Sequence, residues 1–284
     1  MQTSFLRYFI CGFLMGTADT IPGVSGGTIA FITGIYKQLL DAIQSVNGHF
    51  ARLIFRGRIK EALSLIPWNF CIPLVLGIGT AIFSLAKIVV YLLHTYPSFL
   101  WAFFFGLILA SLFFLLQELK QAQGFVVSSI SLFFCGIGLA LWLTFAEAMT
   151  LSHSPIILFM SGFIAICAMI LPGISGSFLL VLLGQYQFVL QSISTLQFDV
   201  IATFGLGALC GLLSFSRLIS YCLEHYFRPC LAFLSGILAG SLVMLWPYTE
   251  CTSQSPTTLM LITGLLLLGL SIPLVLHRIM LHKR

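Results

Sequence analysis

The fold is decided by the stretch Pro22-Gly23-Val24-Ser25-Gly26-Gly27, which returns as Pro172-Gly173-Ile174-Ser175-Gly176-Ser177. Both copies lie inside long apolar stretches. Proline and glycine interrupt a helix, and lipid cannot satisfy the backbone groups that such an interruption frees. Interruptions at matching positions in two halves of a chain are typical of the binding sites of membrane transporters.

Composition places the chain in a membrane. Of its 284 residues, 59% are hydrophobic and only 7% are charged, and the mean hydropathy is +1.08. Soluble domains carry about a quarter charged residues, so we expect an all-α, polytopic membrane protein without a separate soluble domain. The 8 cysteines form no CxxC pair, which indicates neither a disulfide framework nor a metal site. No cofactor, metal or nucleic-acid partner is expected.

The similarity between the two halves extends well beyond the repeated phrase. Matching residues stand 150 positions apart in the first part of each half and 130 positions apart in the second part. The polar stretch 44–67, which the second half largely lacks, accounts for the difference. The matching pairs include Pro22 and Pro172, Gly34 and Gly184, Tyr36 and Tyr186, Lys87 and Arg217, Tyr91 and Tyr221, and Gly106 and Gly236. Agreement at glycine, proline, tyrosine and a cation predicts an internal duplication.

Each half contains four apolar segments. They are Phe5–Leu40, Phe70–Leu93, Phe99–Leu116 and Phe125–Ala146 in the first half, and Pro155–Ile193, Val200–Leu223, Leu231–Trp246 and Thr257–Leu276 in the second. A spanning helix needs about 20 apolar residues, so three segments of each half are predicted to cross the membrane once. The first segment of each half is too long for one span and is interrupted by the repeated phrase.

Charge placement predicts how the interrupted segments are threaded. The stretch 44–67 carries four Lys or Arg residues against Glu61 alone, so we expect it to be cytoplasmic. The other loops with Lys or Arg fall on the same side if the interrupted segment enters and leaves on one side. It is then a re-entrant hairpin of two half-helices or, as the alternative, two short full spans.

Three crossings per half place the halves in opposite orientations, as an inverted-topology repeat with cytoplasmic N- and C-termini. The predicted boundaries are 1–147 for the first repeat (hairpin 5–43, basic loop 44–67, three spans) and 148–284 for the second (hairpin 155–193, three spans).

The hairpin tips are the candidate site. The turns are formed by Pro22, Gly23, Pro172 and Gly173. Small hydroxyl residues after the turns are suited to cap the half-helix that follows, and the free amides at its start favour an anion. The candidate phosphate-binding residues are Ser25, Gly26, Gly27, Thr28, Ser175, Gly176 and Ser177. The alternative is a tight turn that only allows helices to pack closely in lipid.

Two matched cations strengthen the hypothesis of an anionic substrate. Lys87 and Arg217 occupy equivalent positions inside predicted spans, where a charge costs about 2.5–3.5 kcal/mol on insertion scales. We therefore expect them to bind the same phosphate, although either side chain can also extend to an interface. Asp19 is a candidate for proton coupling or for pairing with Lys87, with capping of local backbone as the alternative. Glu147 is a second candidate for proton coupling, with an interface position as the alternative.

The doubled motif resembles that of one bacterial inner-membrane family. The resemblance rests on Gly16–Thr28 followed by Gly34-Ile35-Tyr36, and on Leu171–Ser177 followed by Gly184-Gln185-Tyr186. It covers essentially the whole chain. The family, long described only as a domain of unknown function, is regarded as polyprenyl-phosphate (undecaprenyl-phosphate) translocases. The resemblance implies a multi-pass protein of the bacterial inner membrane that returns undecaprenyl phosphate across the bilayer for envelope polymer synthesis.

Three other functions stay open at this point. A membrane polyprenyl-pyrophosphate phosphatase would use a similar turn, but it would need an arginine there and clustered glutamates, where this chain has Gly26 and Gly176. We therefore predict no enzymatic activity. An ion-coupled anion transporter or channel could use the same helix ends. A purely structural membrane subunit would leave the matched cations unexplained.

Overall fold

The chain folds into fourteen described helices. The computed structural model describes residues 2–20, 24–124, 126–149, 151–243, 245–246 and 256–281, and the side chain of Lys87 lies outside the described part. The helices of the first half are α1 (Gln2–Asp19), α2 (Gly26–Ile32), α3 (Tyr36–Gln44), α4 (Gly48–Phe55), α5 (Ile59–Ser64), α6 (Trp68–Thr95), α7 (Pro97–Gln121) and α8 (Val126–Phe145). Those of the second half are α9 (Pro155–Ile170), α10 (Gly176–Leu182), α11 (Tyr186–Ser194), α12 (Phe198–His225), α13 (Phe227–Ser241) and α14 (Pro256–Leu281).

The structure is that of an all-α, polytopic membrane protein, as the composition predicts. Within the described residues, five helices are long and apolar enough to cross a membrane, namely α6, α7, α8, α12 and α14. Helix α13, predicted as a sixth ordinary span, has 15 residues, or about 22 Å. The chain continues from α13 to Trp246 in tight turns in which amides bond to carbonyls three residues earlier.

Both interrupted segments break near their Pro-Gly phrase, and each breaks again eight residues after its Ser-Gly. The second break is a left-handed turn at Gly34 (φ 68°) and at Gly184 (φ 67°), positions that match in the two halves. The amides of Ile35 and Gln185 bond to carbonyls five residues earlier, Ala30 and Leu180, which satisfies the free end of the preceding helix. Each predicted pair of half-helices is therefore three helices. The second of the three has only 7 residues, and the third is turned away from it. The angle between α10 and α11 is 112°.

The helices pack in corresponding pairs, α1 on α6 and α9 on α12. A Cβ on Gly77 of α6 would collide with the carbonyl of Phe9 on α1, and a Cβ on Gly207 of α12 would collide with that of Phe159 on α9. These two contacts match at the offsets of the sequence repeat. The backbones touch at both places, which small residues allow in membranes.

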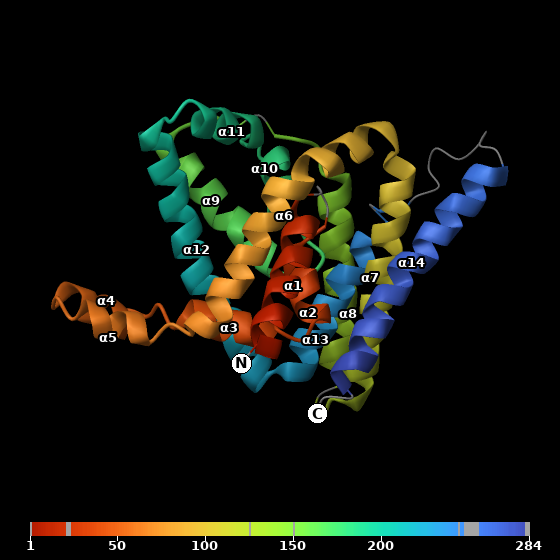
Figure 1. The fold of residues 1–284 in the computed structure, drawn as a ribbon, viewed down its shortest axis with the longest axis horizontal. Helices are drawn as coiled ribbons and strands as arrows, with labels where there is room; N and C mark the ends of the chain where they lie inside the picture. Colours follow the sequence, from red (N-terminus) through yellow and green to blue (C-terminus); the bar gives the residue numbers. More distant parts are fainter. Residues whose placement is uncertain are drawn as a thin grey trace.

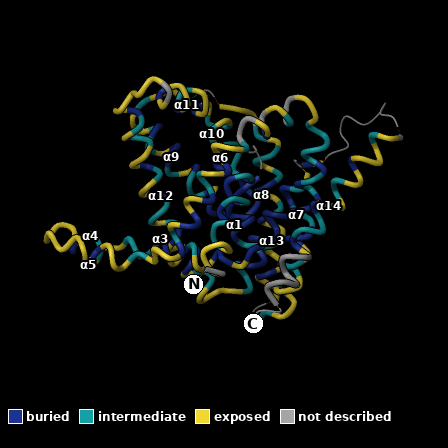
Figure 2. Tube along the Cα trace, viewed as in Figure 1, coloured by how far each residue is buried: buried dark blue, intermediate teal, exposed yellow. Residues whose placement is uncertain are grey.

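The remaining long helices pair across the two halves. Helix α7 packs on α14, and α13 packs on α8. Gly106 of α7 lies against the carbonyl of Leu266, and its counterpart Gly236 of α13 lies against that of Phe133. The halves are therefore interlocked and share one core, in which α7 and α13 are central and dark blue in Figure 2.

The hairpins enter this core from opposite ends. In Figure 1, α1 rises from the end of the body at which α14 finishes, whereas α9 descends from the end at which α11 lies. Helices α4 and α5, which fall in the predicted basic loop 44–67, form an arm that extends sideways from the first end. The predicted loop is thus largely helical.

Candidate functional site: the meeting hairpin tips

The first tip, between α1 and α2, has its amides occupied by the protein itself. Ser25 is the N-cap of α2, and its hydroxyl accepts a hydrogen bond from the amide of Gly27 at 3.1 Å. The amide of Thr28 donates to the Ser25 carbonyl at 3.0 Å. The amide of Gly26 donates to the Asp19 carboxylate at 2.7 Å. A carboxyl group of the protein already occupies the start of this helix. Pro22 and Gly23 of the predicted turn lie outside the described residues.

The second tip, between α9 and α10, is capped differently. The Ser175 hydroxyl accepts from the amide of Phe178 at 3.5 Å, and it lies 2.9 Å from the hydroxyl of Ser177. Gly173 has φ 90°, a conformation that glycine adopts readily. In the part of the chain that the structure describes, the amides of Gly176 and Ser177 have no hydrogen-bond acceptor. Met169 stands where the first half has Asp19, so no carboxylate caps this tip.

The two tips are in contact. The Ser25 hydroxyl donates to the carbonyl of Met169 at 3.0 Å, and the amide of Gly173 donates to the Thr28 hydroxyl at 2.9 Å. The Tyr36 hydroxyl, at the start of α3, donates to the carbonyl of Ile170 at 3.1 Å. The last carbonyls of α9 would otherwise lack partners, and the first hairpin supplies them. The two hairpin tips therefore meet in the structure.

Gly27 fits this contact because it has no side chain. A Cβ at this position would lie 2.8 Å from the Met169 carbonyl oxygen and 2.9 Å from that of Ile170. Gly26 is restricted in the same way by its neighbour in the first tip, since a Cβ there would lie 2.5 Å from the Asp19 carboxylate. The Gly-Gly pair thus allows both the contact between the tips and the capping by Asp19.

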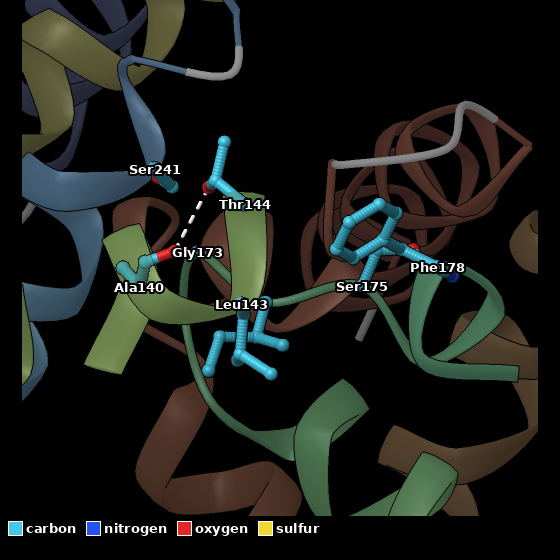
Figure 3. A pocket seen from close by; sticks show the side chains of 8 residues that line it. Ala140, Leu143, Thr144, Gly173, Ser175, Phe178 and Ser241 are labelled. Carbon is cyan, nitrogen blue, oxygen red and sulfur yellow. Dashed lines mark hydrogen bonds between the residues drawn. The ribbon is translucent and has the colours of Figure 1, made fainter. Parts of the chain in front are cut away.

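A small pocket opens beside the second tip (Figure 3). It is lined by Ala140, Leu143 and Thr144 of α8, by Ser241 of α13, and by Gly173, Ile174, Ser175 and Phe178 of the second hairpin. Three hydroxyl groups, those of Thr144, Ser175 and Ser241, lie among apolar side chains. The Thr144 hydroxyl donates to the carbonyl of Ala140 at 2.8 Å (dashed in Figure 3) and keeps its acceptor capacity.

Sequence reasoning missed Thr144 and Ser241 as part of the pocket. The repeat could have indicated Ser241, because this residue matches Ser111 of the first half. Both side chains are buried in the structure. Thr144 carried no signal beyond being a polar residue in an apolar run.

The structure does not place the Arg217 side chain at the tips. Arg217 is exposed, and its guanidinium donates to the carbonyl of Val46, just after α3, at 3.3 Å. The backbone of Lys87 lies at the equivalent place on α6, but its side chain is outside the described part. Because α6 and α12 run in opposite directions (Figure 1), positions 87 and 217 lie toward opposite ends of the body.

The two candidates for proton coupling also lie apart. Asp19 has its partner in the first tip, the amide of Gly26. Glu147 is exposed in the connection between α8 and α9. Of the two, only Asp19 lies at the meeting tips.

Comparisons with known proteins show the family of the chain. Residues 15–263 match the family model described as VCA0040-like, undecaprenyl phosphate translocase-like. The chain is 42% identical over 250 residues to a polyprenyl-phosphate transporter of Vibrio cholerae serotype O1, covering 88% of this chain and 80% of the relative. It is 33% identical over 253 residues to a polyprenyl-phosphate transporter of Staphylococcus aureus, covering 83% of this chain and 84% of the relative. No solved structure matches. The chain belongs to the VCA0040-like, undecaprenyl phosphate translocase-like family.

Proposed function

We propose that this protein is a transporter of polyprenyl phosphate and that it returns undecaprenyl phosphate from the outer to the inner leaflet of the bacterial inner membrane. The observation that carries the proposal is the contact between two interrupted hairpins from opposite ends of the body. Family membership supports the substrate, because both curated relatives are named polyprenyl-phosphate transporters. Irregular backbone at membrane depth is tolerated where it lines a cavity or is buried in protein.

The two halves act as an inverted-topology repeat, with the boundaries predicted from the sequence. The matched glycine contacts of α6 and α12, and the exchanged pairs α7–α14 and α13–α8, support this symmetry. The end of the body with the arm is cytoplasmic, by its excess of Lys and Arg. Both termini are on that side.

The headgroup passes the second tip. Ser175, Gly176 and Ser177 hold the phosphate there, supported by two free amides and by the hydroxyls of the adjacent pocket. Charge favours this tip, because Asp19 gives Ser25, Gly26, Gly27 and Thr28 a negative neighbour. The pocket is little larger than a water molecule, so a phosphate enters only after the second hairpin separates from α8. One repeat rocks against the other about the tips.

Lys87 and Arg217 bind the headgroup at the two ends of its path. Arg217 lies near the cytoplasmic end, and the register of α6 supports an equivalent position for Lys87 near the opposite end. Each cation therefore serves one leaflet, and the isoprenoid tail stays in lipid throughout. Protons are the candidate coupling ion, with Asp19 as the candidate site.

Transport of labelled polyprenyl phosphate in proteoliposomes tests the proposal. We expect flipping by the native protein and a loss of at least tenfold in Ser175→Ala/Ser177→Ala, because both hydroxyls at the second tip are removed. Ser131→Ala, on the exposed face of α8, is the matched control. Phosphate release from polyprenyl pyrophosphate, or electrogenic anion flux without lipid substrate, would contradict the proposal in favour of an enzyme or a channel.

A further inference from the structure

The arm formed by α4 and α5 has almost no core of its own. Leu53 and Ala62 are its buried residues, and they pack the two helices together. Helices of 8 and 6 residues are too short to be stable in water by themselves. The arm nevertheless has well-formed ends, because Asn47 caps α4 through two amides and Gly57 makes a left-handed turn with φ 71°. It is a defined structure that lacks a supporting surface.

The surface of the arm is amphipathic. His49 and Arg52 of α4 and its C-cap residue Arg56 follow one another at helical spacing and share one face. Ile54 and Phe55 lie outside that face, and the side chain of Phe55 is 90% exposed. In α5 and the residues after it, the large apolar side chains of Ile59, Leu63, Leu65 and Trp68 are also exposed. Large exposed apolar side chains beside a line of cations are typical of helices that lie in a membrane interface.

The charges of the arm have few partners within the protein. Arg58 pairs with Glu61, which also raises the pKa of the Arg58 guanidinium above its usual value. Arg52, Arg56 and Lys60 form no ion pair with any described residue. The arm therefore presents three uncompensated cations, which attract an anionic lipid surface strongly and a neutral one weakly.

The placement of the arm suits such a surface. Figure 1 shows it extending sideways, across the direction of α6 and α12, at the level where α1 begins. Its base is fixed to α12, since Gln44 donates to the carbonyl of Ser216 at 3.4 Å and Arg217 donates to that of Val46 at 3.3 Å. The arm leads directly into the start of the spanning helix α6 and extends across its direction, which places the arm at headgroup depth. The second half has no counterpart, because only 195–197 separate α11 from α12.

We propose that the α4–α5 arm is an interfacial anchor that binds the anionic leaflet, with Phe55, Ile59 and Leu63 among the acyl chains and Arg52, Arg56 and Lys60 at the lipid phosphates. The anchor fixes the end of α3, and with it the first hairpin, to one membrane surface. This binding is independent of the substrate and of the proposed transport.

Hydrogen–deuterium exchange of the full-length protein in nanodiscs tests the proposal. Nanodiscs of phosphatidylcholine are compared with nanodiscs that also contain phosphatidylglycerol, both without polyprenyl phosphate. We expect the amides of 48–66 to exchange several-fold more slowly with phosphatidylglycerol. Arg52→Gln/Arg56→Gln should lower the affinity of the arm for anionic lipid by about fivefold per charge and thereby remove most of the slowing. Phe55→Ser should also reduce the slowing.

Two controls make the result decisive. Lys120→Gln removes a cation at the end of α7, outside the arm, and should leave the lipid effect unchanged. Slow exchange of α13 in every variant shows that the body is folded. Equal exchange of 48–66 in both lipids, or protection that persists in Arg52→Gln/Arg56→Gln, would overturn the proposal. Protection in lipid-free detergent would also overturn it, in favour of contact with a second protein.

Discussion

Replacing Gly27 with alanine tests the contact between the tips most directly. The added Cβ would lie 2.8 Å from the Met169 carbonyl oxygen, 2.9 Å from that of Ile170 and 3.2 Å from the Ser25 hydroxyl. The first two neighbours are backbone atoms at the end of α9, so the tips themselves must move apart. Two hydrogen bonds join the hairpins at these same carbonyls, from Ser25 and from Tyr36.

The expected cost follows from these contacts. Overpacking a close contact costs about 1–3 kcal/mol, and each of the two hydrogen bonds contributes about 1 kcal/mol if it is lost. Alanine returns less than about 1 kcal/mol through its higher helix propensity. We therefore expect Gly27→Ala to lower the free energy of unfolding by about 2–4 kcal/mol, with transport reduced because the tips no longer meet.

A glycine without neighbours provides the matched control. Gly79 lies within α6, and nothing is found within 4 Å of the Cβ that it lacks. Gly79→Ala should be neutral or slightly stabilising. Thermal unfolding of the purified protein in detergent and lipid flipping in proteoliposomes measure the two effects. If Gly27→Ala unfolds at the same temperature as Gly79→Ala and transports normally, the hairpins do not meet as described.

Three further substitutions test the other parts of the site. Thr28→Val leaves the amide of Gly173 without its acceptor and should cost about 1–3 kcal/mol of stability. Thr28→Ser keeps the hydroxyl and is the control. Equal unfolding temperatures of these two variants would refute the hydrogen bond. Asp19→Ala removes a helix cap and should cost about 1 kcal/mol, while Asp19→Asn keeps an acceptor and should retain most of that stability. If Asp19 couples transport to protons, Asp19→Asn should also flatten the pH profile of flipping, and an unchanged profile would exclude that role. Lys87→Gln/Arg217→Gln should leave the unfolding temperature close to that of the native protein and slow flipping at least tenfold; normal flipping would remove the cations from the mechanism.

The sequence repeat predicted the parts of the fold that depend on backbone breaks. The interruption at the Pro-Gly phrase follows from what proline and glycine allow. The second break, at Gly34 and Gly184, was not predicted, although the two glycines match in the repeat. The pairing of α7 with α14 and of α8 with α13 was not predicted, since apolar helices in lipid look alike in composition. Close approaches of glycines such as Gly106 and Gly236 distinguish their partners, and sequence does not reveal which carbonyl faces a glycine.

The arm and Arg217 show a second limit of the sequence. The stretch 44–67 was read as a basic loop because its helices are too short for a clear periodic signal. Arg217 was expected at membrane depth from its distance along a predicted span. The structure instead has α3 lying across the end of α12, and a carbonyl of the α3–α4 connection reaches that arginine. Depth along one helix therefore did not determine which neighbours a side chain has.

The repeated phrase predicts the same anion-binding groups at both tips, and the structure makes the tips unequal. The difference arises about one helical turn before the phrase, where the first half has Asp19 and the second half has Met169 at the equivalent position. The Asp19 carboxylate accepts a hydrogen bond from the amide of Gly26. The equivalent amide of Gly176 has no acceptor among the described residues. A phosphate approaching both tips meets repulsion at one and free donors at the other. Under the proposed function, the second tip is therefore the one expected to hold the headgroup, and Ser175→Ala/Ser177→Ala tests that expectation.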